Sequence, residues 1–366
     1  MISVRRVYLY APLPGPPDHM PYAHAAIALA EGLTRFGIEF YADRPYWRLR
    51  ADRADTLFRF DKGVGPADCD LVLVDRHIFA YRHDIALDAV RQLAPRAILV
   101  LIDHTDFLRR APEPPYDVFD IVLEAHGRVG GIRRPNRHPW PFALTTRQIE
   151  AGSGARAFAR RQWVMRDSFR NTAHPHSARV FAGRRVYPAL GDALPSSIAL
   201  HEPAPDPQDQ LMWHQTGRRH ARDYFEDLKT VAACCCISGW FVPCGHWLPP
   251  GLLFPGRRLL AFSGLSSRCI VQWDSWRLWE AMACGAAAVH VDFQAYGMEF
   301  PERPINWTHY IGVDLDRPRL ARERLMDEPE IVESIAAAGR EWALAQYSPA
   351  ALAHRFLLLL GWKLTP

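Results

Sequence analysis

The sequence predicts an α/β protein with two domains, each built around a parallel β-sheet that helices cover on both faces. Short apolar segments alternate with helical segments in two successive regions of the chain, and such strands are typical of buried parallel sheets. At 366 residues the chain is long enough for two hydrophobic cores. Its 49% hydrophobic and 23% charged residues are typical of a folded globular protein rather than a disordered or fibrous one.

The N-terminal region supplies the first set of predicted strands and helices. Each strand is a short apolar run, and the first helix is an Ala/Leu-rich segment that Gly37 ends. We expect strands at Val7–Ala11, Ile38–Ala42, Leu71–Asp75, Ala97–Asp103 and Asp120–Ala125, and helices at Tyr22–Phe36 and Asp84–Leu93.

Polar residues gather where these predicted strands end, which is where parallel sheets bind ligands. They are Asp18 and His19 in a proline-rich loop after the first strand, Asp75 to His77 after the third, Asp103 to Asp106 after the fourth, and Glu124 with His126 after the fifth. The sequence contains no Gly-x-Gly-x-x-Gly, the fingerprint of dinucleotide-binding domains. We therefore expect this region to hold an acceptor and a catalytic base.

A second alternating region follows a proline-rich stretch, Pro135–Pro141, which we expect to link the two domains. Its predicted elements are strand Gln162–Arg166, helix Ser177–Leu190, strand Ser197–His201, helix Arg218–Thr230 and strand Val231–Ile237. The loop after the first of these strands offers phosphate-binding donors from Arg170, Asn171 and Thr172. A capped, solvent-exposed loop accounts for these three residues equally well.

The strand Val231–Ile237 leads into Ser238, Gly239 and Trp240. Glycine permits the close approach of a ligand, and the indole ring can stack on a nucleobase or pack in a core. The residues from 240 to 268 are rich in Pro, Gly, Trp and Arg, so we expect an inserted loop or lid there.

The clearest functional motif is Ser275–Gly285, which an apolar run follows. Its first residue, or Asp274 before it, can cap a helix that the glycine ends, so the pattern predicts a short helix leading into a buried strand. Arg277 and Glu280 share one face of that helix, and a helix N-terminus favours anions. This combination suits a phosphorylated ribose, the recognition half of a nucleotide-sugar. The alternative is that Arg277 and Glu280 form an ordinary ion pair on a solvated helix.

The Glu-Ala-Met-Ala-Cys-Gly sequence at 280–285 and the strand after it resemble the donor-binding signature of GT-B glycosyltransferases, and Ser275 and Arg277 ahead of it resemble exostosin-like variants. The resemblance implies two facing Rossmann-like domains and a C-terminal helix that crosses back to the first domain. It also implies that Glu280 holds the ribose hydroxyls of the donor. Gln272 departs from the pattern, because many retaining members have a second Glu there, and Ala287 replaces the usual Pro.

The same resemblance divides the chain into an N-terminal domain on the acceptor side (1–140), a C-terminal domain on the donor side (141–347) and a terminal helix (348–366). Ser348 and Pro349 are the expected start of that helix, a cap followed by proline at the first helical position. The helix is apolar on most sides, so we expect it to be buried.

The motif and the resemblance together predict a glycosyltransferase that moves a sugar from a nucleotide-sugar donor to an acceptor. A small molecule, a glycan, a protein and a modified nucleic-acid base all remain candidates for that acceptor. Two other functions stay open: a nucleotide-sugar epimerase or hydrolase of the same fold, and a two-lobed binding protein without catalysis. The residues expected to bind the donor are Arg170, Asn171, Thr172, Ser238, Gly239, Trp240, Asp274, Ser275, Arg277 and Glu280.

Gln272 in place of the second Glu favours an inverting mechanism, in which one base takes the acceptor's proton. We predict His19 as that base, because an unperturbed imidazole titrates near 6.5 and the proline-rich loop fixes its position. Inverting GT-B enzymes often carry a catalytic histidine in the same loop, a similarity of position. Asp18 or Asp103 is expected to orient the ring or act as the base itself, and the alternative is that His19 is an exposed loop residue without a catalytic role.

No Asp-x-Asp motif stands at the end of a predicted strand, so we expect the helix dipole and Arg277 to take the place of a metal, and no cofactor beyond the nucleotide-sugar co-substrate. Seven cysteines without regular spacing fit a reducing compartment. Prolines interrupt the N-terminal segment, and no stretch reaches eighteen apolar residues, so we expect a cytoplasmic protein without a transmembrane segment. A net charge of +4 permits an anionic substrate without marking a nucleic-acid-binding protein.

Overall fold

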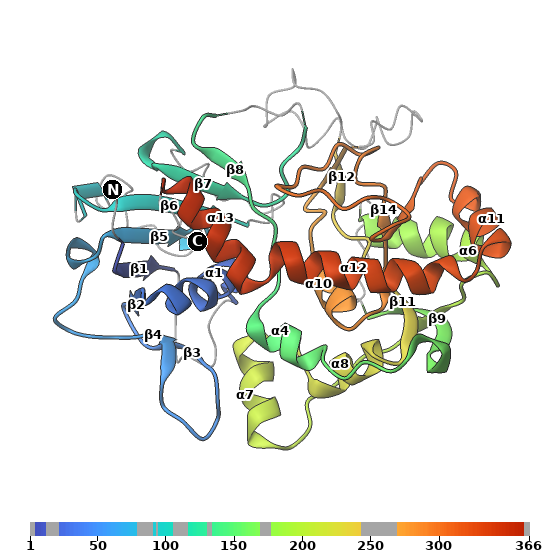
Figure 1. Ribbon diagram of the computed structural model, residues 1–366, viewed down its shortest axis with the longest axis horizontal. Helices are drawn as coiled ribbons and strands as arrows, with labels where there is room; N and C mark the ends of the chain where they lie inside the picture. Colours follow the sequence, from blue (N-terminus) through green and yellow to red (C-terminus); the bar gives the residue numbers. More distant parts are fainter. Residues whose placement is uncertain are drawn as a thin grey trace.

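A computed structural model describes residues 4–11, 22–78, 91–92, 94–104, 116–129, 134–168, 177–242 and 269–361. Two parallel β-sheets lie side by side, the first at the left of Figure 1 and the second at the right. The predicted α/β class with two Rossmann-like domains is therefore confirmed.

The first sheet contains six parallel strands in the order β2-β1-β5-β6-β7-β8. They are β1 (Arg6–Tyr10), β2 (Glu39–Ala42), β5 (Leu71–Asp75), β6 (Ile98–Asp103), β7 (Ile121–Glu124) and β8 (Arg137–Pro139). The strand order reverses its direction between β1 and β5, and sheets of this kind bind ligands beside such a reversal.

Strand β8 corrects the prediction of a linker at Pro135–Pro141. Residues Arg137–Pro139 pair with β7 at the edge of the sheet, where a proline costs no ladder hydrogen bond because one side of the strand is unpaired. The prediction was wrong because it assumed that a proline-rich segment cannot join a sheet. The chain leaves the first sheet after β8 and reaches the second at β9.

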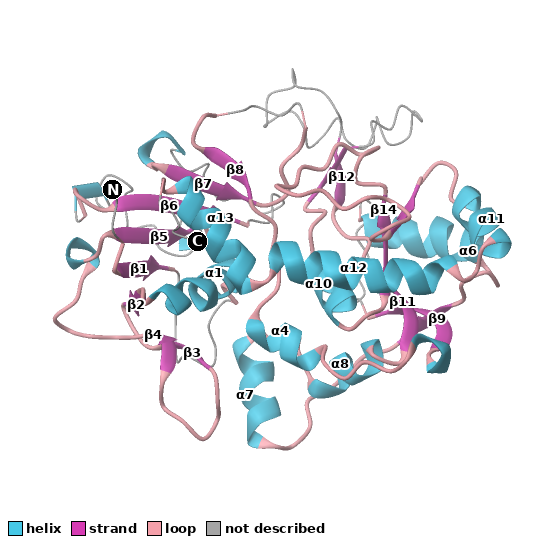
Figure 2. Cartoon of the chain, in the orientation of Figure 1, coloured by secondary structure: helices cyan, strands magenta, loops and turns pink. Residues whose placement is uncertain are grey.

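The second sheet repeats the strand order of the first, with five parallel strands arranged β10-β9-β11-β14-β15. They are β9 (Gln162–Asp167), β10 (Ser196–Ile198), β11 (Val231–Cys235), β14 (Ala287–Val291) and β15 (Ile311–Val313). Figure 2 draws all strands in magenta. Two small antiparallel hairpins that the sequence did not predict lie outside the two parallel sheets. The hairpins are β3 (Tyr46–Arg48) with β4 (Thr56–Phe58), and β12 (Trp240–Val242) with β13 (Cys269–Val271).

The described helices flank these sheets. They are α1 (His24–Leu33), α4 (Thr146–Ala151), α5 (Ala178–Phe181), α6 (Tyr187–Leu190), α7 (Pro207–Gln215), α8 (Arg222–Leu228), α10 (Trp276–Ala283), α11 (Arg319–Asp327), α12 (Ile331–Tyr347) and α13 (Pro349–Leu359). None of them is both long and apolar enough to cross a membrane.

Two predicted helices differ from the structure, and two predicted segments cannot be compared with it. Helix Ser177–Leu190 is instead α5 and α6 joined by a π-helical stretch, and helix Arg218–Thr230 begins only at Arg222, because Arg218 is left-handed (φ 62°). Most of the helix predicted at Asp84–Leu93 and of the inserted loop predicted at 240–268 lies outside the described residues.

The C-terminal helix returns to the first domain, as the resemblance implied. Figure 1 shows α12 running from the second domain toward the first, where α13 lies beside α1. The Ser348 hydroxyl accepts from the Ala351 N–H and Pro349 occupies the first helical position, so the predicted cap is confirmed. Gly32 of α1 lies so close to the Pro349 carbonyl that a Cβ there would clash with it. This close contact fixes α13 against the first domain.

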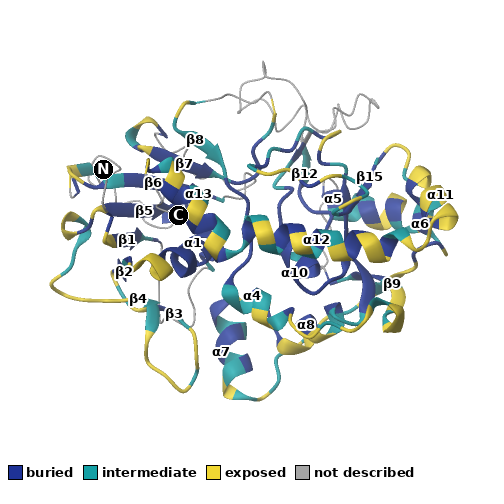
Figure 3. Ribbon diagram, viewed as in Figure 1, coloured by how far each residue is buried: buried dark blue, intermediate teal, exposed yellow. Residues whose placement is uncertain are grey.

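The hydrophobic core runs through both domains. One buried cluster extends from Val7 and Leu73 in the first sheet, through Trp140 and Phe356, to Val289 in the second. The central strands of both sheets are accordingly dark blue in Figure 3. A second, smaller cluster covers the other face of the first sheet. Apolar packing therefore holds the two sheets in a fixed relation, and polar groups line the space between them.

Candidate functional site

A cleft of about 1240 Å³ lies between the two domains. On one side it is lined by the start of α1 and by residues that end or follow β5, β6 and β7. On the other side it is lined by residues that follow β9 and β11, by α7, by the turn before α8 and by the start of α10. The carboxyl ends of both sheets thus open onto one cavity, where ligands of doubly wound sheets bind.

Helix α10 begins in this cleft without a side-chain cap. Ser275, the N-cap residue, is extended (φ −148°, ψ 151°), yet its side chain accepts no hydrogen bond from the first turn. The buried Ser275 Oγ and Trp276 Nε1 also have no hydrogen-bond partner among the described residues. Uncapped helix ends and unsatisfied buried donors are stabilised by a bound ligand, and a helix N-terminus favours an anionic one.

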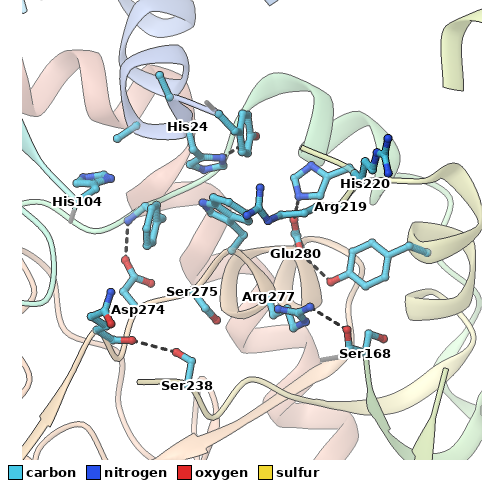
Figure 4. Close-up of a pocket in the computed structure, with 18 of the residues that line it drawn as sticks. His24, His104, Ser168, Arg219, His220, Ser238, Asp274, Ser275, Arg277 and Glu280 are labelled. Carbon is cyan, nitrogen blue, oxygen red and sulfur yellow. Dashed lines mark hydrogen bonds and ion pairs between the residues drawn. The ribbon is translucent and has the colours of Figure 1, made fainter. Parts of the chain in front are cut away.

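Arg277 lies at the same helix end. Its Nη2 donates to the carbonyl oxygen of Ser168 over 2.8 Å, directly after β9 (Figure 4). Ser168 is itself buried, and its Oγ has no partner within the described part of the chain. Arg277 therefore sits between the start of α10 and the loop predicted to bind phosphate. That loop's residues Arg170, Asn171 and Thr172 lie outside the described residues.

A second guanidinium, which the sequence analysis missed, lies at the same end of α10. Arg219 stacks over the Trp276 ring at 4.7 Å and donates from Nη1 to the Thr216 carbonyl. Gly217 and Arg218 before it are both left-handed, at φ 63° and 62°. This turn places Arg219 in the cleft lining. The run Thr-Gly-Arg-Arg-His at 216–220 was the available signal, a glycine turn followed by cations.

Glu280 is buried at the base of this region, with 2% of its surface exposed. Its Oε1 lies 2.6 Å from His220 Nε2 and accepts from Gln148 Nε2 over 3.2 Å, and its Oε2 accepts from the Tyr224 hydroxyl over 2.7 Å (Figure 4). This excludes the alternative of a solvated ion pair with Arg277. Because each carboxylate oxygen has two acceptor positions, Oε2 retains capacity for one more donor.

Glu280 is ionised in this environment. Burial alone would raise its pKa, but His220, the Tyr224 hydroxyl and the charge of Arg277 together outweigh burial and lower the pKa to about 2. The pKa of His220 is lowered, because burial outweighs the attraction of Glu280. A neutral imidazole therefore faces a carboxylate, and Glu280 presents a negative charge that suits hydroxyl donors.

Asp274, the other predicted cap, is occupied by the protein. Its Oδ2 accepts from the Phe142 N–H over 2.6 Å, and its Oδ1 accepts from Trp279 Nε1 over 2.9 Å. Burial raises the pKa of this carboxyl to about 7. Since Phe142 lies between the two sheets in the chain, Asp274 joins the start of α10 to the interdomain segment.

The segment Ser238–Trp240 also lines the cleft. The Ser238 hydroxyl donates to the Trp273 carbonyl over 2.6 Å, and Gly239 (φ 95°) lies so close to the Val271 carbonyl that a Cβ would clash with it. Gln272, opposite, is left-handed at φ 54°, and its Oε1 is buried without a partner among the described residues. These residues form a tightly packed corner with an amide oxygen available to a ligand.

The first domain contributes imidazoles and one carboxylate to the described lining. His77 Nδ1 lies 2.8 Å from Asp75 Oδ1. Burial lowers the pKa of His104 to about 4, and those of His24 and His126 to about 3, so these three rings are neutral near pH 7. The sequence had placed His77, His104 and His126 at strand ends, and the structure brings them to one cavity.

The predicted catalytic residues are only partly described. Asp103 lies next to the cleft-lining residues His104 and Ile102 but is not itself part of the lining. Its Oδ2 accepts from Arg76 Nη1 and from the Tyr116 hydroxyl, each over 2.7 Å. The carboxylate is thus committed to a buried ion pair, which disfavours a role as base. Asp18 and His19 lie outside the described residues.

No group of three or more His, Cys, Asp or Glu side chains in the described ranges is placed to hold a metal ion. Cys234, Cys235 and Cys236 are free thiols buried in and directly after β11.

Two similarly wound parallel sheets that face each other across a cleft, with a terminal helix returning to the first domain, define the GT-B fold. Over 99% of its length the chain is similar to an alpha-glucosyltransferase in complex with UDP and a 13-mer DNA containing a central A:G mismatch (11% identity, all of that chain covered, TM-score 0.55). It is also similar to an alpha-glucosyltransferase in complex with UDP-glucose and DNA containing an abasic site (9% identity, 98% of this chain and 99% of that one, TM-score 0.54).

No protein-family model and no curated protein matches the sequence. At such low identities the structural likeness establishes the fold, and the predicted GT-B resemblance is confirmed at that level.

Proposed function

We propose that this protein is a nucleotide-sugar-dependent glycosyltransferase. The observation that carries the proposal is the start of α10, where an uncapped helix end, Arg277 and the ionised Glu280 line one wall of the interdomain cleft. A helix N-terminus and a guanidinium bind phosphate, and a carboxylate accepts from hydroxyl groups. A nucleoside diphosphate carries both kinds of group. The two similar alpha-glucosyltransferase structures contain UDP and UDP-glucose, and this supports the choice of ligand.

In this proposal the diphosphate lies over the start of α10. Arg277 and Ser275 contact its oxygens, and Arg219 adds a second positive charge from the stacked position on Trp276. Arg170, Asn171 and Thr172 of the preceding loop are proposed as further donors. Negative charge on the diphosphate grows as the glycosidic bond breaks, so these cations stabilise the transition state more than the bound donor.

The ribose lies against Glu280 and uses the remaining acceptor position on Oε2. The nucleobase occupies the corner formed by Ser238, Gly239 and Trp240, where Gly239 permits close approach. Asp274 acts on the donor indirectly, because its hydrogen bonds hold the start of α10. Gln272, whose Oε1 is buried without a described partner, is placed to contact the transferred sugar.

The reaction that we propose is metal-independent and inverting. The guanidinium groups take the place of a cation at the leaving diphosphate, and a base from the first domain takes the acceptor's proton while the acceptor attacks the opposite face of the sugar carbon. His19, with Asp18, remains the predicted base of the loop after β1. In this arrangement residues 1–140 hold the acceptor, residues 141–347 hold the donor, and the helix in 348–366 joins the two.

The first test is a calorimetric titration of the protein with UDP, GDP, ADP, CDP and TDP. At a hundred times its dissociation constant, a bound nucleotide should stabilise the fold by about 2.7 kcal/mol in a thermal melt. Arg277→Ala should abolish most of this binding, whereas Arg322→Ala, which removes an exposed pair with Asp192, serves as the matched control. A protein that binds none of the five nucleotides is not a glycosyltransferase of this kind.

The second test separates the three functions by product. Labelled UDP-glucose is incubated with the protein alone and with representatives of each acceptor class: a small phenol, an oligosaccharide, a peptide and DNA with hydroxymethylated bases. Transfer to any acceptor supports the proposal. Conversion of the donor without an acceptor supports an epimerase or hydrolase, and simple retention of the donor supports a binding protein.

A further inference from the structure

Four aromatic rings that contact one another lie along the cleft, from the end of β6 to the start of α10. His104 lies edge-on to Phe142 with the ring centroids 4.7 Å apart, and Phe142 lies edge-on to Trp276 at 5.8 Å. Tyr22 meets the other side of the set, edge-on to Trp276 at 5.0 Å. We call these four residues the aromatic row. All four line the cleft and are partly exposed.

The aromatic row stands next to the proposed donor site. Trp276 directly follows Ser275, the N-cap of α10, where the diphosphate is proposed to lie. His104 directly follows β6 in the first domain, and Phe142 belongs to the segment between the two sheets. A molecule that packs on these rings therefore lies between the two domains, beside the leaving group of the transfer reaction.

Small and apolar side chains border the aromatic row on the first domain. They line the cleft and are Ala23, Ala25 and Ala26 at the start of α1 and Ile102 in β6. Short side chains leave space beside the rings, and apolar surface is stabilised when a ligand removes it from water. This part of the cleft therefore suits a flat apolar group.

Several polar groups of the same wall are already hydrogen-bonded within the protein. His24 has a partner at each ring nitrogen. His126 Nδ1 accepts from the Asp274 N–H, and Asp75 Oδ1 accepts from the His77 backbone N–H. An acceptor with many hydroxyl groups, such as an oligosaccharide, would have to compete with these bonds.

The charge of the wall disfavours an anionic acceptor. No arginine or lysine occurs among the described first-domain residues that line the cleft. Burial lowers the pKa of His104 to about 4 and those of His24 and His126 to about 3, so these imidazoles are neutral near pH 7. A negatively charged acceptor, including the phosphates of a nucleic acid, would gain no guanidinium or ammonium partner on the described part of this wall.

The aromatic row also offers a hydrogen bond. His104 Nε2 is buried and has no hydrogen-bond partner among the described residues. A neutral imidazole nitrogen donates to a hydroxyl or accepts from one, according to the tautomer. The row thus combines ring surfaces with a single polar contact at its first-domain end.

Resting on the proposed function, we propose that the acceptor is an uncharged small molecule with a planar aromatic ring, and that the aromatic row binds it. The ring packs in offset or edge-on contacts, which aromatic pairs prefer. The acceptor's hydroxyl oxygen bonds to the anomeric carbon of the donor. The bond from that carbon to the diphosphate oxygen breaks, and its electron pair leaves with the nucleoside diphosphate. The hydroxyl proton passes to the base proposed above and then to solvent.

The experiment measures the transfer of labelled glucose from UDP-glucose to two matched alcohols. Benzyl alcohol and cyclohexylmethanol carry the same hydroxymethyl group on rings of similar size, but only the first ring is planar and aromatic. The wild-type kcat/KM should be at least tenfold higher for benzyl alcohol, because each aromatic contact strengthens binding by roughly threefold to tenfold. A benzyl alcohol that carries a carboxylate should be a poorer acceptor at pH 7.

Two variants of Tyr22 test whether the aromatic row is responsible for this preference. Tyr22→Leu removes one ring, so the preference for benzyl alcohol over cyclohexylmethanol should fall about threefold or more while the Kd for UDP stays unchanged. Tyr22→Phe keeps the ring and should keep the preference. His354→Gln, an exposed substitution on α13, is the control for activity. A ratio between two acceptors reports binding at the row, because a general loss of folded protein lowers both rates equally.

The outcomes separate this inference from the proposed function. A protein that binds UDP but does not prefer benzyl alcohol, or that transfers only to the oligosaccharide, the peptide or hydroxymethylated DNA, overturns the acceptor class and leaves the donor site standing. A preference for benzyl alcohol that Tyr22→Leu leaves intact overturns the aromatic row as the binding site. A protein that neither binds UDP nor releases it from UDP-glucose overturns both proposals.

Discussion

The two walls of the cleft share one strand order but differ in the groups they present. The wall from the second domain carries Arg219, Arg277 and an uncapped helix end, all of which attract anions. The described wall from the first domain carries Asp75 and imidazoles that burial keeps neutral. The same sheet topology thus brings strand ends to the cavity twice, and the side chains at those ends decide which half of a reaction each wall serves.

Phe142, which lies between the two sheets in the chain, contacts both walls. The Phe142 N–H donates to Asp274 at the start of α10, and the Phe142 ring makes edge contacts with His104 at 4.7 Å and His126 at 5.7 Å, measured between centroids. A shift of the donor wall would therefore move the ring that packs against the acceptor wall. We expect substitutions in each wall to separate donor effects from acceptor effects, except where the walls touch, as at Phe142 and at the Asp274 N–H, which donates to His126 Nδ1.

The largest effect should come from Arg277. It lies on the wall from the second domain, which we call the cationic wall because it carries Arg219 and Arg277. Arg277→Ala should lower turnover by roughly a hundred- to a thousandfold, the cost of removing one group that stabilises transition-state charge. Arg277→Lys should be nearly as damaging, because a guanidinium binds phosphate with two parallel hydrogen bonds and an ammonium cannot. Steady-state kinetics with UDP-glucose measure both variants. A lysine variant with wild-type turnover would show that charge alone suffices at this wall.

The second-largest effect should come from a substitution of Glu280. Glu280→Gln keeps the shape of the side chain but loses the charge, so UDP should bind about tenfold to a hundredfold more weakly, corresponding to roughly 1.5 to 3 kcal/mol for charge-assisted hydrogen bonds. Calorimetry with UDP and with UMP measures the change. The nucleoside uridine should lose affinity as well, since the ribose is the contact. Loss confined to the diphosphate would place the ribose elsewhere.

Glu280→Ala is a less informative variant than Glu280→Gln. The Tyr224 hydroxyl and Gln148 Nε2 donate buried hydrogen bonds to the Glu280 carboxylate, and His220 Nε2 lies 2.6 Å from it. Removing the carboxylate would leave these groups unsatisfied and destabilise the fold. Thermal melts of the glutamine and alanine variants, compared at one pH, should show the larger loss for alanine.

Particular elements show how much of the fold could be predicted from the sequence. Strand Leu71–Asp75 was predicted to the residue, because a fully apolar run ends at a charged residue. Helix α7 was missed although Asp206 caps it and Pro207 begins it, because its polar residues show no apolar periodicity. Strand β15 was missed because three residues are too few for a pattern.

The sequence predicted only part of the candidate site, because its patterns report only contacts between residues that are close in the chain. Spacing placed Arg277 and Glu280 on one helix face, since that relation is local. His220, Tyr224 and Gln148 approach Glu280 from segments that are far away in the sequence, and no periodicity reports such contacts. Asp75 and His77 are close in the sequence, but only the fold shows that Asp75 is buried and His77 is partly exposed.

The buried imidazoles of the first domain should make the protein less stable in acid. His126 should account for part of that loss of stability. The pKa of His126 is about 3 in the folded protein and near 6.5 when unfolded, so the unfolded state binds the proton more readily and stability falls as the pH drops below about 6.5. At pH 5 this amounts to about 2 kcal/mol relative to pH 7. His126→Asn should remove that contribution, and asparagine suits the left-handed backbone (φ 62°) at this position.

Urea titrations of wild type and His126→Asn at pH 5 and 7 measure this difference. His354→Asn, on the exposed face of α13, is the control and should retain the full pH dependence. The carboxyl of Asp274 acts in the opposite direction, because burial raises its pKa to about 7 and its contribution is lost as the pH rises through that value. An unchanged acid sensitivity in His126→Asn would mean that this ring is protonated without cost.

The smallest effect should come from Arg219, and it tests whether the cationic wall acts through contact or through its field. Arg219 is exposed and held by stacking on Trp276, whereas Arg277 is half-buried and bonded to Ser168. Exposed charge pairs contribute little and are screened by salt, so Arg219→Gln should weaken UDP binding only about threefold at low salt. In 0.5 M salt the difference should nearly vanish, while the effect of Arg277→Ala should persist because that guanidinium lies against the helix end. Equal salt dependence for the two variants would show that neither arginine touches the phosphates directly and that the wall attracts the donor at a distance.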